Sequence, residues 1–314
     1  MKASLLHPTR SLGTLMGLFL LCLAMWAATP YFLTPSNLVN VLQQTAINAI
    51  ISVGMTYVII TAGIDLSVGS ILALAAVVMA GLLAEGFSPW LAVPAGLLVG
   101  TLAGTVNGLL ITAGRLPPFI ATLGMMSAAR GAALVYTGGR PISGFEEGFR
   151  HVATGETFSL PFPILLMLAV YALFHVLLSR TLFGRYVYAI GGNEEAARLS
   201  GVRVGRIKTA VYAISGLMSA LAGVVLTARL NSAQPTAGIM YELDAIAATV
   251  IGGTSLMGGI GHLGGTLIGA LIMGVLRNGL NLLNVSSYVQ QIIIGSVIIV
   301  AVLVDAAMKR RGGS

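Results

Sequence analysis

Long apolar runs, separated by short polar connections, follow one another along almost the whole chain, and no other feature restricts its fold as strongly. A membrane-spanning α-helix needs about 20 predominantly apolar residues, so the 314 residues leave room for about ten spans and little else. The runs are continuous, whereas the strands of a transmembrane β-barrel alternate apolar and polar residues over about ten positions. The sequence therefore predicts an all-α fold, a polytopic bundle of transmembrane helices.

Ten apolar segments can be distinguished along the chain. They are Leu12–Phe32, Leu38–Thr61, Leu66–Ala84, Pro89–Thr112, Pro118–Tyr136, Pro161–Leu178, Thr209–Ala228, Ala245–Met257, Leu263–Leu283 and Tyr288–Val304. Ala245–Met257 is too short to cross a bilayer alone, and irregular backbone at membrane depth is stable only inside protein or beside a water-filled cavity. We therefore expect at least one broken or short helix. Leu12–Phe32 exceeds the apolar core of a signal peptide, about 7–15 residues, so we expect an uncleaved first span.

The few charged residues predict the orientation of the bundle. They make up 9% of the chain, against about 25% in a soluble domain, which excludes an ordinary cytosolic enzyme, a disordered chain and a nucleic-acid-binding module. Basic residues of membrane proteins concentrate in cytoplasmic connections. With a cytoplasmic N-terminus, that side holds Lys2, Arg10, Arg115, Arg180, Arg185, Arg198, Arg203, Arg206, Lys208, Lys309, Arg310 and Arg311, and the opposite side holds Arg140, Arg150 and Arg229. This asymmetry predicts that both termini are cytoplasmic and that the number of spans is even.

Two connections are long: residues 137–160 outside, and residues 180–208 inside, the most basic part of the chain. We otherwise assign residues 1–314 to a single transmembrane domain. The chain has no G-x-x-x-x-G-K-[ST], H-E-x-x-H or G-x-S-x-G motif, and its histidines have no metal-ligand spacing. We therefore expect no catalytic residue, no metal site and no cofactor bound by this chain. Uphill transport would need energy from a partner or an ion gradient, and we place no acid clearly at mid-membrane depth.

The segment Ala62–Ser70 joins the second and third predicted spans and carries Asp65 just before an apolar run. An aspartate in this position is a favourable helix N-cap, because its carboxylate accepts a free backbone N–H and complements the helix dipole. Gly63 is expected to allow a tight turn. The functional alternative is that Gly63, Asp65 and Ser67 belong to a cytoplasmic gate or to the site that meets a driving subunit.

Several motifs resemble the ribose-type sugar permeases of bacterial ABC importers. Ala62–Ser70, read as A-G-I-D-L-S-V-G-S, is similar to the signature of that family, and further similar stretches follow in the family's order between about residues 38 and 305. They are Leu116–Gly124, Ala129–Gly131, Thr137–Ile142, Gly191–Gly201, Gly252–Gly259 and Asn278–Leu283. Each stretch is weak evidence alone, but together and in order they are specific.

This resemblance implies the components that the chain lacks. Such a permease is one half of a dimeric pore in the bacterial inner membrane, paired with a second copy of itself or with a different chain. A cytoplasmic ATPase that uses ATP and Mg drives it, and a periplasmic sugar-binding protein delivers the substrate, a ribose-like monosaccharide. The alternatives are a related polyol or furanosyl signal molecule as substrate, a stand-alone secondary transporter or channel, and an intramembrane enzyme.

The inside connection contains a predicted short helix. Asn193 suits its N-cap, Glu194 and Glu195 are favourable in its first turn, and Gly201 can end it in the left-handed conformation. By resemblance this helix couples the permease to the ATPase. The implied contact residues are Asn193, Glu194, Glu195, Arg198, Leu199 and Gly201. The alternative is an interfacial helix held against lipid headgroups.

Polar residues within the predicted spans are candidates for a translocation path. They are Gln43, Gln44, Asn48, Asn107, Arg130, Asn278 and Asn281. Amide side chains suit a sugar because they both donate to and accept from hydroxyl groups. The alternative is hydrogen bonding between helices, worth about 0.6 kcal/mol on average. The family resemblance implies that selectivity lies mainly in the binding protein.

Arg130 and Arg277 are charges within predicted spans, which are by default functional-site hypotheses. Arg130 could equally cap the C-terminus of a neighbouring helix. Arg277 stands where the resembled family usually has an uncharged polar residue, and Tyr288–Gln291 lacks the tryptophan expected there. These departures leave the exact sugar open.

Overall fold

The computed structural model describes residues 8–157 and 160–312. Lys2, one of the predicted cytoplasmic cations, and residues 158–159 of the predicted external connection lie outside this part of the chain. The helices are α1 (Pro8–Ala28), α2 (Pro35–Ile60), α3 (Val68–Ala84), α4 (Pro89–Thr112), α5 (Pro118–Thr137), α6 (Glu147–Thr154), α7 (Phe162–Arg180), α8 (Leu182–Gly192), α9 (Glu194–Leu199), α10 (Val204–Leu230), α11 (Tyr241–Ile251), α12 (Leu263–Leu282) and α13 (Ser287–Gly312).

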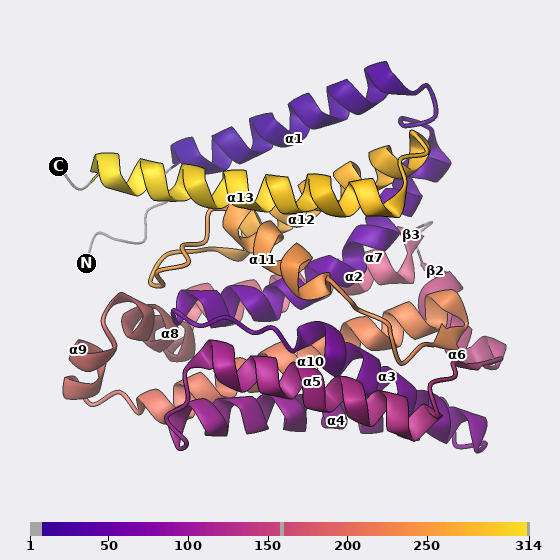
Figure 1. The fold of residues 1–314 in the computed structure, drawn as a ribbon, viewed down its shortest axis with the longest axis horizontal. Coiled ribbons are helices and arrows are strands. Elements are labelled where there is room, and N and C mark those ends of the chain that lie inside the picture. Colours follow the sequence, from indigo (N-terminus) through magenta and orange to yellow (C-terminus); the bar gives the residue numbers. More distant parts are fainter. Residues whose placement is uncertain (1–7, 158–159, 313–314) are drawn as a thin grey trace.

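The long helices form a bundle with two distinct ends (Figure 1). One end, here called the α9 end, carries α8, α9, the start of α1 and the finish of α13. The opposite end, the α6 end, carries α6 and two small antiparallel sheets. Their strands are β1 (Ile142–Ser143) with β4 (Ser232–Ala233), and β2 (Glu156–Thr157) with β3 (Leu160–Pro161).

Each of the ten predicted apolar segments lies on a helix, so the all-α, polytopic prediction is confirmed. Within the described residues, six helices are long and apolar enough to cross a membrane: α2, α4, α5, α7, α10 and α12. The apolar parts of α1, α3 and α13 are shorter. The number of ten spans and the cytoplasmic placement of both termini stay predictions.

Local sequence explains where many of these helices begin and end. Proline occupies the first or second position of α2, α4, α5 and α7. Its missing N–H is harmless there, and its fixed φ suits the first turn. Gly138 ends α5 in the left-handed conformation with φ of 61°, which glycine adopts without steric cost.

Two short helices begin inside the bundle rather than at its ends. Figure 1 shows α3 and α11 each starting near the middle, after an irregular segment that enters from one end. α11 has 11 residues, so the expectation of a short helix is confirmed. The two irregular regions meet where Gly69 lies directly against the backbone of Gly238, so that a Cβ atom on either residue would overlap the other chain segment. Glycine is required on both sides of this crossing.

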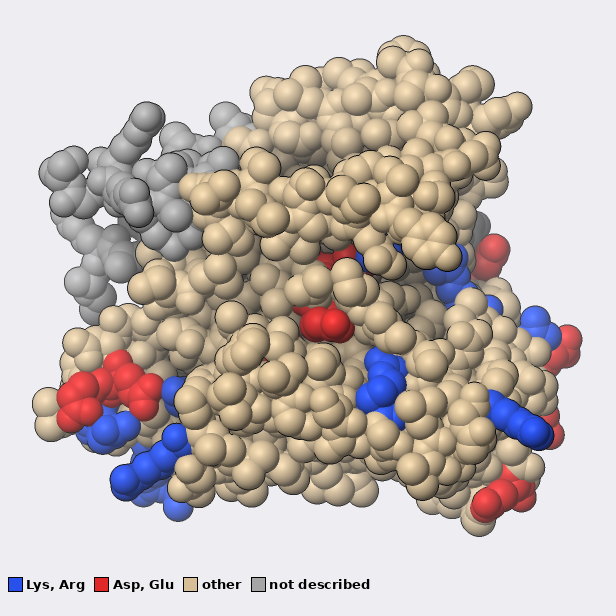
Figure 2. Space-filling model, viewed as in Figure 1, with Lys and Arg blue, Asp and Glu red and all other residues tan. Residues whose placement is uncertain are grey.

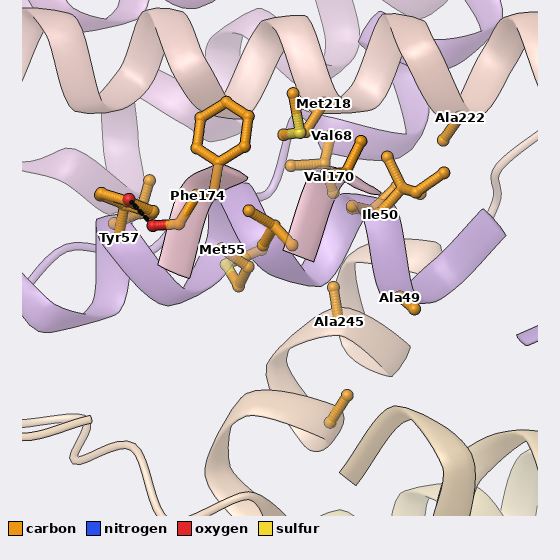
Figure 3. Close-up of a cluster of buried hydrophobic side chains, with 14 of the residues drawn as sticks. Ala49, Ile50, Met55, Tyr57, Val68, Val170, Phe174, Met218, Ala222 and Ala245 are labelled. Carbon is orange, nitrogen blue, oxygen red and sulfur yellow. Dashed lines mark hydrogen bonds between the residues drawn. The ribbon is translucent and has the colours of Figure 1, made fainter. Parts of the chain in front are cut away.

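The largest apolar core surrounds α2. From Ala46 to Ile60 this helix is buried except at Asn48, as expected of a helix that is apolar on all sides. Figure 3 shows side chains of α2 packed against α7, α10 and α11. The Tyr57 hydroxyl donates to the Phe174 carbonyl at 2.7 Å, and the Tyr171 hydroxyl donates to the Ala49 carbonyl at 3.1 Å. These bonds join α2 to α7 and pair both tyrosine hydroxyls.

Small residues allow α4 and α10 to pack backbone against backbone. On α4, Gly96, Gly100, Gly104 and Gly108 recur every four residues and so share one face. A Cβ atom on Gly104 would overlap the Tyr212 carbonyl oxygen of α10. Such small-xxx-small faces permit close helix approach inside a bilayer.

Several elements were not expected from the sequence. They are α6, α8 and the four two-residue strands. α8 contains Gly184, Gly191 and Gly192, which lower helix propensity by about 1 kcal/mol each relative to alanine. Tertiary contacts compensate, because Gly184 lies against the Leu178 carbonyl and Gly191 against the Ile60 carbonyl.

Candidate functional site

The predicted helix after Asn193 is present as α9 and has the predicted capping. Asn193 has extended backbone, and its side-chain oxygen accepts the Ala196 N–H at 2.9 Å. At the other end Gly201 has φ of +85°. The Gly201 N–H bonds to the Arg198 carbonyl and the Val202 N–H bonds to the Ala197 carbonyl, which is the Schellman arrangement. Both the N-cap and the glycine stop are therefore confirmed.

The charged side chains of α9 form a small network of ion pairs. Arg198 pairs with Glu194 and with Glu195, each at 3.0 Å, and Lys208 of α10 pairs with Glu194 at 2.9 Å. Leu199 is 81% exposed at the tip of the helix. Figure 2 shows acidic and basic side chains gathered at this end of the molecule. The result is a rigid, charged lever with one exposed apolar side chain.

α8 is anchored to the connection between α11 and α12, residues 252–262. The Tyr188 hydroxyl of α8 donates to the Gly261 carbonyl at 2.6 Å. The Gly259 N–H donates to the Ile60 carbonyl at the end of α2 at 2.9 Å, beside Gly191. A displacement of α8, which α9 follows in the chain, would therefore act on this connection.

Asp65 is fully buried, and its bonding differs from the expected N-cap. Ser67 holds the N-cap position of α3. Asp65 lies two residues earlier, where its Oδ1 accepts the Ser67 N–H at 2.9 Å and the Ser67 hydroxyl. Its Oδ2 accepts the Ser215 hydroxyl of α10 at 2.7 Å. The N-cap prediction is thus wrong in position, although a backbone N–H is still the partner.

The expected role of Gly63 also needs correction. The residue with a left-handed conformation in this turn is Ala62, with φ of 59°, and Gly63 is not among the positive-φ glycines. Gly63 instead lies against the Tyr212 hydroxyl, which a Cβ atom would overlap. Glycine is needed here for space rather than for backbone freedom.

Asn107, a candidate path residue, belongs to the same buried group. Its Nδ2 donates to the Ser67 hydroxyl oxygen at 2.8 Å, and the residue has no exposed surface. Asp65, Ser67, Asn107 and Ser215 together join the turn before α3 to α4 and α10. These contacts tie the three elements together, although Asn107 Oδ1 is buried without a hydrogen-bond partner.

Asn278 and Asn281 form hydrogen bonds between helices. Asn278 exchanges two bonds with Asn37 of α2, at 3.0 and 2.9 Å, and is buried. Asn281 accepts from Gln290 Nε2 of α13 at 2.8 Å. These contacts are those of the helix-bonding alternative, and a path role for either residue has no direct support here.

The other amides on α2 lie in a different setting. Asn40, Gln44 and Asn48 are spaced four residues apart, so they share one helix face. Gln44 and Arg229 both donate to Asn40 Oδ1 at 3.0 Å. Asn48 donates to Asp244 Oδ2 at 3.2 Å. Gln43, Gln44 and Asn48 are all half-buried.

A buried acid on α11 was missed from the sequence. The segment expected to begin at Ala245 begins at Tyr241, so Glu242 and Asp244 lie on a helix inside the bundle. Asp244 is 1% exposed and pairs with Arg277 of α12 at 2.6 Å. Asp244 is therefore an acid buried inside the bundle, which we did not expect from the sequence. Two features of the sequence could have revealed this pair. Asp244 directly precedes an apolar segment, and Arg277 lies within a predicted span, where a cation needs an anion as partner.

Arg130 supports the irregular backbone before α11. It donates to the carbonyl oxygens of Pro235 and Ala237 at 2.6 and 2.7 Å. Both atoms belong to the segment between β4 and α11, not to a helix C-terminus. Carbonyl groups shielded from water need a hydrogen-bond donor within the protein, and Arg130 supplies it to these two. Among the described residues, no group of three His, Cys, Asp or Glu side chains could hold a metal ion.

Charged side chains of α11 and α12 meet in the interior of the bundle, where Asp244 pairs with Arg277. Figure 2 shows acidic and basic side chains at the bottom of a depression near the centre of the displayed face. The Arg277 side chain is 33% exposed, whereas the side chain of its partner Asp244 is 1% exposed. The arrangement can offer both hydrogen-bond donors and acceptors to a polar molecule that enters the bundle.

Comparisons with known proteins agree with this reading. The family described as the branched-chain amino acid transport system / permease component matches residues 37–302. The ribose import permease protein RbsC of Bacillus subtilis is 53% identical over 298 residues, which cover 94% of this chain and 92% of that protein. RbsC of Escherichia coli K12 is 51% identical over 93% of this chain and 92% of its own length.

A more distant relative carries a different sugar in its name. The D-allose transport system permease protein AlsC of Escherichia coli K12 is 41% identical over 89% of this chain and 86% of its own length. No solved structure matches the chain significantly. The matched region includes every helix from α2 to α12, and the identities far exceed what shared membrane composition would produce. The chain belongs to this family of transport-system permeases.

Proposed function

We propose that this chain is the membrane-spanning permease subunit of an ABC importer that moves ribose, or a closely similar monosaccharide, into the cytoplasm across the bacterial inner membrane. The observation that carries the proposal is the identity of 51–53% to ribose import permeases over more than nine-tenths of the chain. The absence of a nucleotide-binding motif from the sequence is consistent with a separate ATPase that uses ATP and Mg.

The proposed orientation has about ten passages of the membrane, with both termini and the α9 end in the cytoplasm. Two of these passages combine an irregular segment with a half-length helix, α3 or α11. Two facts support the orientation. The start of α1 and the finish of α13 lie at the same end of the bundle, and that end carries α8 and α9 within the most basic connection of the chain.

The proposed ATPase contact is α9 with its exposed Leu199. α9 is capped at both ends and bound to α10 by the ion pair of Lys208 with Glu194. A force applied to α9 is therefore expected to move the helix as a unit rather than unfold it. The bond from Tyr188 to Gly261 would pass that force to the connection between α11 and α12. In this scheme ATP-driven movement at α9 alters α11 and α12, which carry Asp244 and Arg277.

The proposed assembly contains two permease chains, the ATPase and a periplasmic sugar-binding protein. The two chains are expected to be identical copies, and a heterodimer is the alternative. Within this chain, the proposed path uses Gln43, Gln44 and Asn48 together with Arg130 as the support of its wall. Asn107, Asn278 and Asn281 are proposed to serve packing.

The decisive experiment is reconstitution. The purified chain, its ATPase and its binding protein are placed in liposomes, and uptake of radiolabelled ribose is measured with and without ATP. Uptake that requires ATP and the binding protein is expected, and unlabelled allose tests whether the substrate range extends to that hexose. Ribose uptake by the permease alone, driven by an ion gradient, would contradict the proposal and favour a secondary transporter.

A second experiment separates docking from helix stability. Glu195→Arg combined with Arg198→Glu keeps an ion pair between positions 195 and 198 and inverts the charges presented outward, although it removes the pair of Arg198 with Glu194. We expect this double variant and Leu199→Asp to lose ATPase co-purification and ATP-driven uptake while the permease remains in the membrane. If α9 only contacts lipid headgroups, both variants will still bind the ATPase.

A further inference from the structure

Four buried polar atoms without a hydrogen-bond partner occur on three adjoining helices. They are Thr45 Oγ1 and Asn48 Oδ1 of α2, Asp244 Oδ1 of α11 and Arg277 Nε of α12. α2, α11 and α12 pack against one another in every pairing. A buried polar atom without a partner costs about 1–3 kcal/mol. Four other such atoms of the described residues, Asn107 Oδ1, Arg150 Nε, the Tyr212 hydroxyl and Thr254 Oγ1, lie outside these three helices. The four on α2, α11 and α12 can be satisfied together by one polar ligand.

The pairing of Asp244 leaves one of its oxygens free. Arg277 and Asn48 both donate to Oδ2, at 2.6 and 3.2 Å, so Oδ1 receives nothing. Asn48 uses its amide nitrogen in this contact and keeps its own oxygen unpaired. The ion pair therefore holds two acceptors and the Arg277 Nε donor in fixed positions without satisfying them.

Thr45 adds a hydroxyl that behaves unlike other helical threonines of this chain. Thr56, Thr101, Thr105 and Thr112 each donate to the carbonyl four residues earlier. Thr45 has no such bond, although it is 2% exposed. It lies three residues before Asn48, on the same face of α2, and its hydroxyl abuts Gly274, three residues before Arg277.

The unpaired set suits a neutral, hydroxyl-rich ligand. It combines one donor, two acceptors and one hydroxyl that can do either, and the charges of Asp244 and Arg277 offset each other. Each sugar hydroxyl likewise both donates and accepts, so one ring can complete several of these bonds. An anion would meet Asp244, and a cation would meet Arg277, so neither class is matched as well.

The ligand can approach from the side of Arg277. The Arg277 side chain is 33% exposed, whereas the Asp244 side chain is 1% exposed. Arg277 is thus the accessible side of the site, and Asp244 is its buried side. Asn40, Gln44 and Arg229 lie on the same face of α2 or beside it, towards the α6 end.

We propose that Thr45, Asn48, Asp244 and Arg277 form a transient sugar-binding site inside the membrane-spanning part of this chain. The inference rests on the proposed function, and it assigns part of the sugar selectivity to the permease rather than to the binding protein alone. Each lost hydrogen bond of about 1 kcal/mol should weaken binding about fivefold.

The test compares two identical substitutions on one helix. Thr45→Val removes the unpaired hydroxyl with little change of shape. Thr56→Val does the same about three turns further along α2, at a buried hydroxyl already paired with Thr266 at 2.8 Å. Thr45→Ser, which keeps the hydroxyl, serves as the rescue variant. The permease is purified in nanodiscs with its ATPase, and ribose-dependent thermal stabilisation is titrated.

Ribose should stabilise the wild type, Thr56→Val and Thr45→Ser at similar concentrations, whereas Thr45→Val should need about fivefold more. ATP-driven ribose uptake in liposomes should fall for Thr45→Val alone. If Thr45→Val titrates like Thr56→Val, the unpaired atoms are hydrated only and this inference is overturned, while normal wild-type uptake would leave the proposed function standing. If the wild type imports no ribose, the proposed function fails instead.

Discussion

At the scale of single residues, the chain stabilises two buried carboxylates in different ways. Asp65 is surrounded by neutral donors, the Ser67 N–H and the hydroxyl groups of Ser67 and Ser215. Asp244 faces a cation, Arg277, and keeps one oxygen unpaired. Both oxygens of Asp65 are thus paired within the protein, whereas Asp244 keeps one acceptor for a further partner, as the proposed site requires.

Replacing Asp65 tests the first of these assignments. Asp65→Ala would leave the Ser67 N–H and the Ser215 hydroxyl unpaired in the interior, at a cost of about 1–3 kcal/mol each. We expect a clear fall in the thermal unfolding temperature, measured in detergent. Ribose uptake per folded molecule should be retained. Loss of uptake with an unchanged unfolding temperature would instead assign Asp65 to a gate.

His262 makes the start of α12 sensitive to pH. Its Nδ1 accepts the Gly265 N–H at 2.8 Å and so caps the helix. Burial, with a smaller effect of nearby His175, lowers the pKa of His262 below its ordinary value. The unfolded chain therefore binds the proton more readily, and the stability contributed by this cap is complete above about pH 6.5 and is lost as the pH falls below that value.

His262→Asn keeps a capping oxygen but does not titrate. Thermal unfolding at pH 7.5 and pH 5.5 should show a steeper loss for the wild type than for the variant. The difference should be about 1 kcal/mol, the usual contribution of a cap. Equal losses in the two proteins would show that the imidazole is not responsible.

At the scale of elements, the contact between α4 and α10 depends on glycine. Gly216 of α10 lies against the Gly100 carbonyl as closely as Gly104 lies against the Tyr212 carbonyl. Because these neighbours are backbone atoms, they cannot move aside as a side chain could. The two helices therefore hold the buried group of Asp65 at a fixed separation.

Gly104→Ala should destabilise the protein by about 1–3 kcal/mol, the usual range for an overpacked contact. Gly124→Ala on α5 is the matched control, because a Cβ atom there meets nothing within 4 Å. Alanine favours the helix over glycine by about 1 kcal/mol, so this control should be neutral or slightly stabilising. The measurement is the unfolding temperature of each variant in the same detergent, which should be lower for Gly104→Ala than for Gly124→Ala. Equal unfolding temperatures would contradict the close packing of α4 and α10.

At the scale of the whole molecule, the bundle has chemically different ends. The α9 end carries the capped α9 lever, and the α6 end carries α6 and both small sheets. The proposed ATPase and binding protein need opposite faces of the membrane. The two ends meet that requirement only if each lies on a different side of the bilayer.

This orientation can be measured, because Cys22 is the single cysteine of the chain. In a Cys22→Ala background, Glu195→Cys and Glu147→Cys introduce one exposed thiol at the α9 end and one at the α6 end. A membrane-impermeant maleimide added to intact spheroplasts should label Glu147→Cys alone, and inside-out vesicles should reverse the result. Labelling of both variants from one side would contradict the predicted topology.

The class of fold and much of α9 could be predicted from local sequence. Continuous apolar runs of about 20 residues have few stable alternatives to a membrane helix. Asn193 and Gly201 act on backbone atoms within a few residues of themselves, so their effect is visible in the sequence alone. The resemblance to sugar permeases likewise rested on short motifs, and relatives over more than nine-tenths of the chain confirm it.

Tertiary structure decided which polar residues belong together. Asp244 and Arg277 are 33 residues apart, Asp65 and Ser215 are 150 residues apart, and Arg130 supports carbonyl groups more than 100 residues away. The start of α11 at Tyr241 likewise depends on its protein surroundings, since an acidic turn inside a bundle is stable only beside a partner such as Arg277. Sequence by itself determined the elements that local backbone chemistry and hydrophobicity stabilise. The site depends on contacts between distant segments, which exist only once the helices have packed.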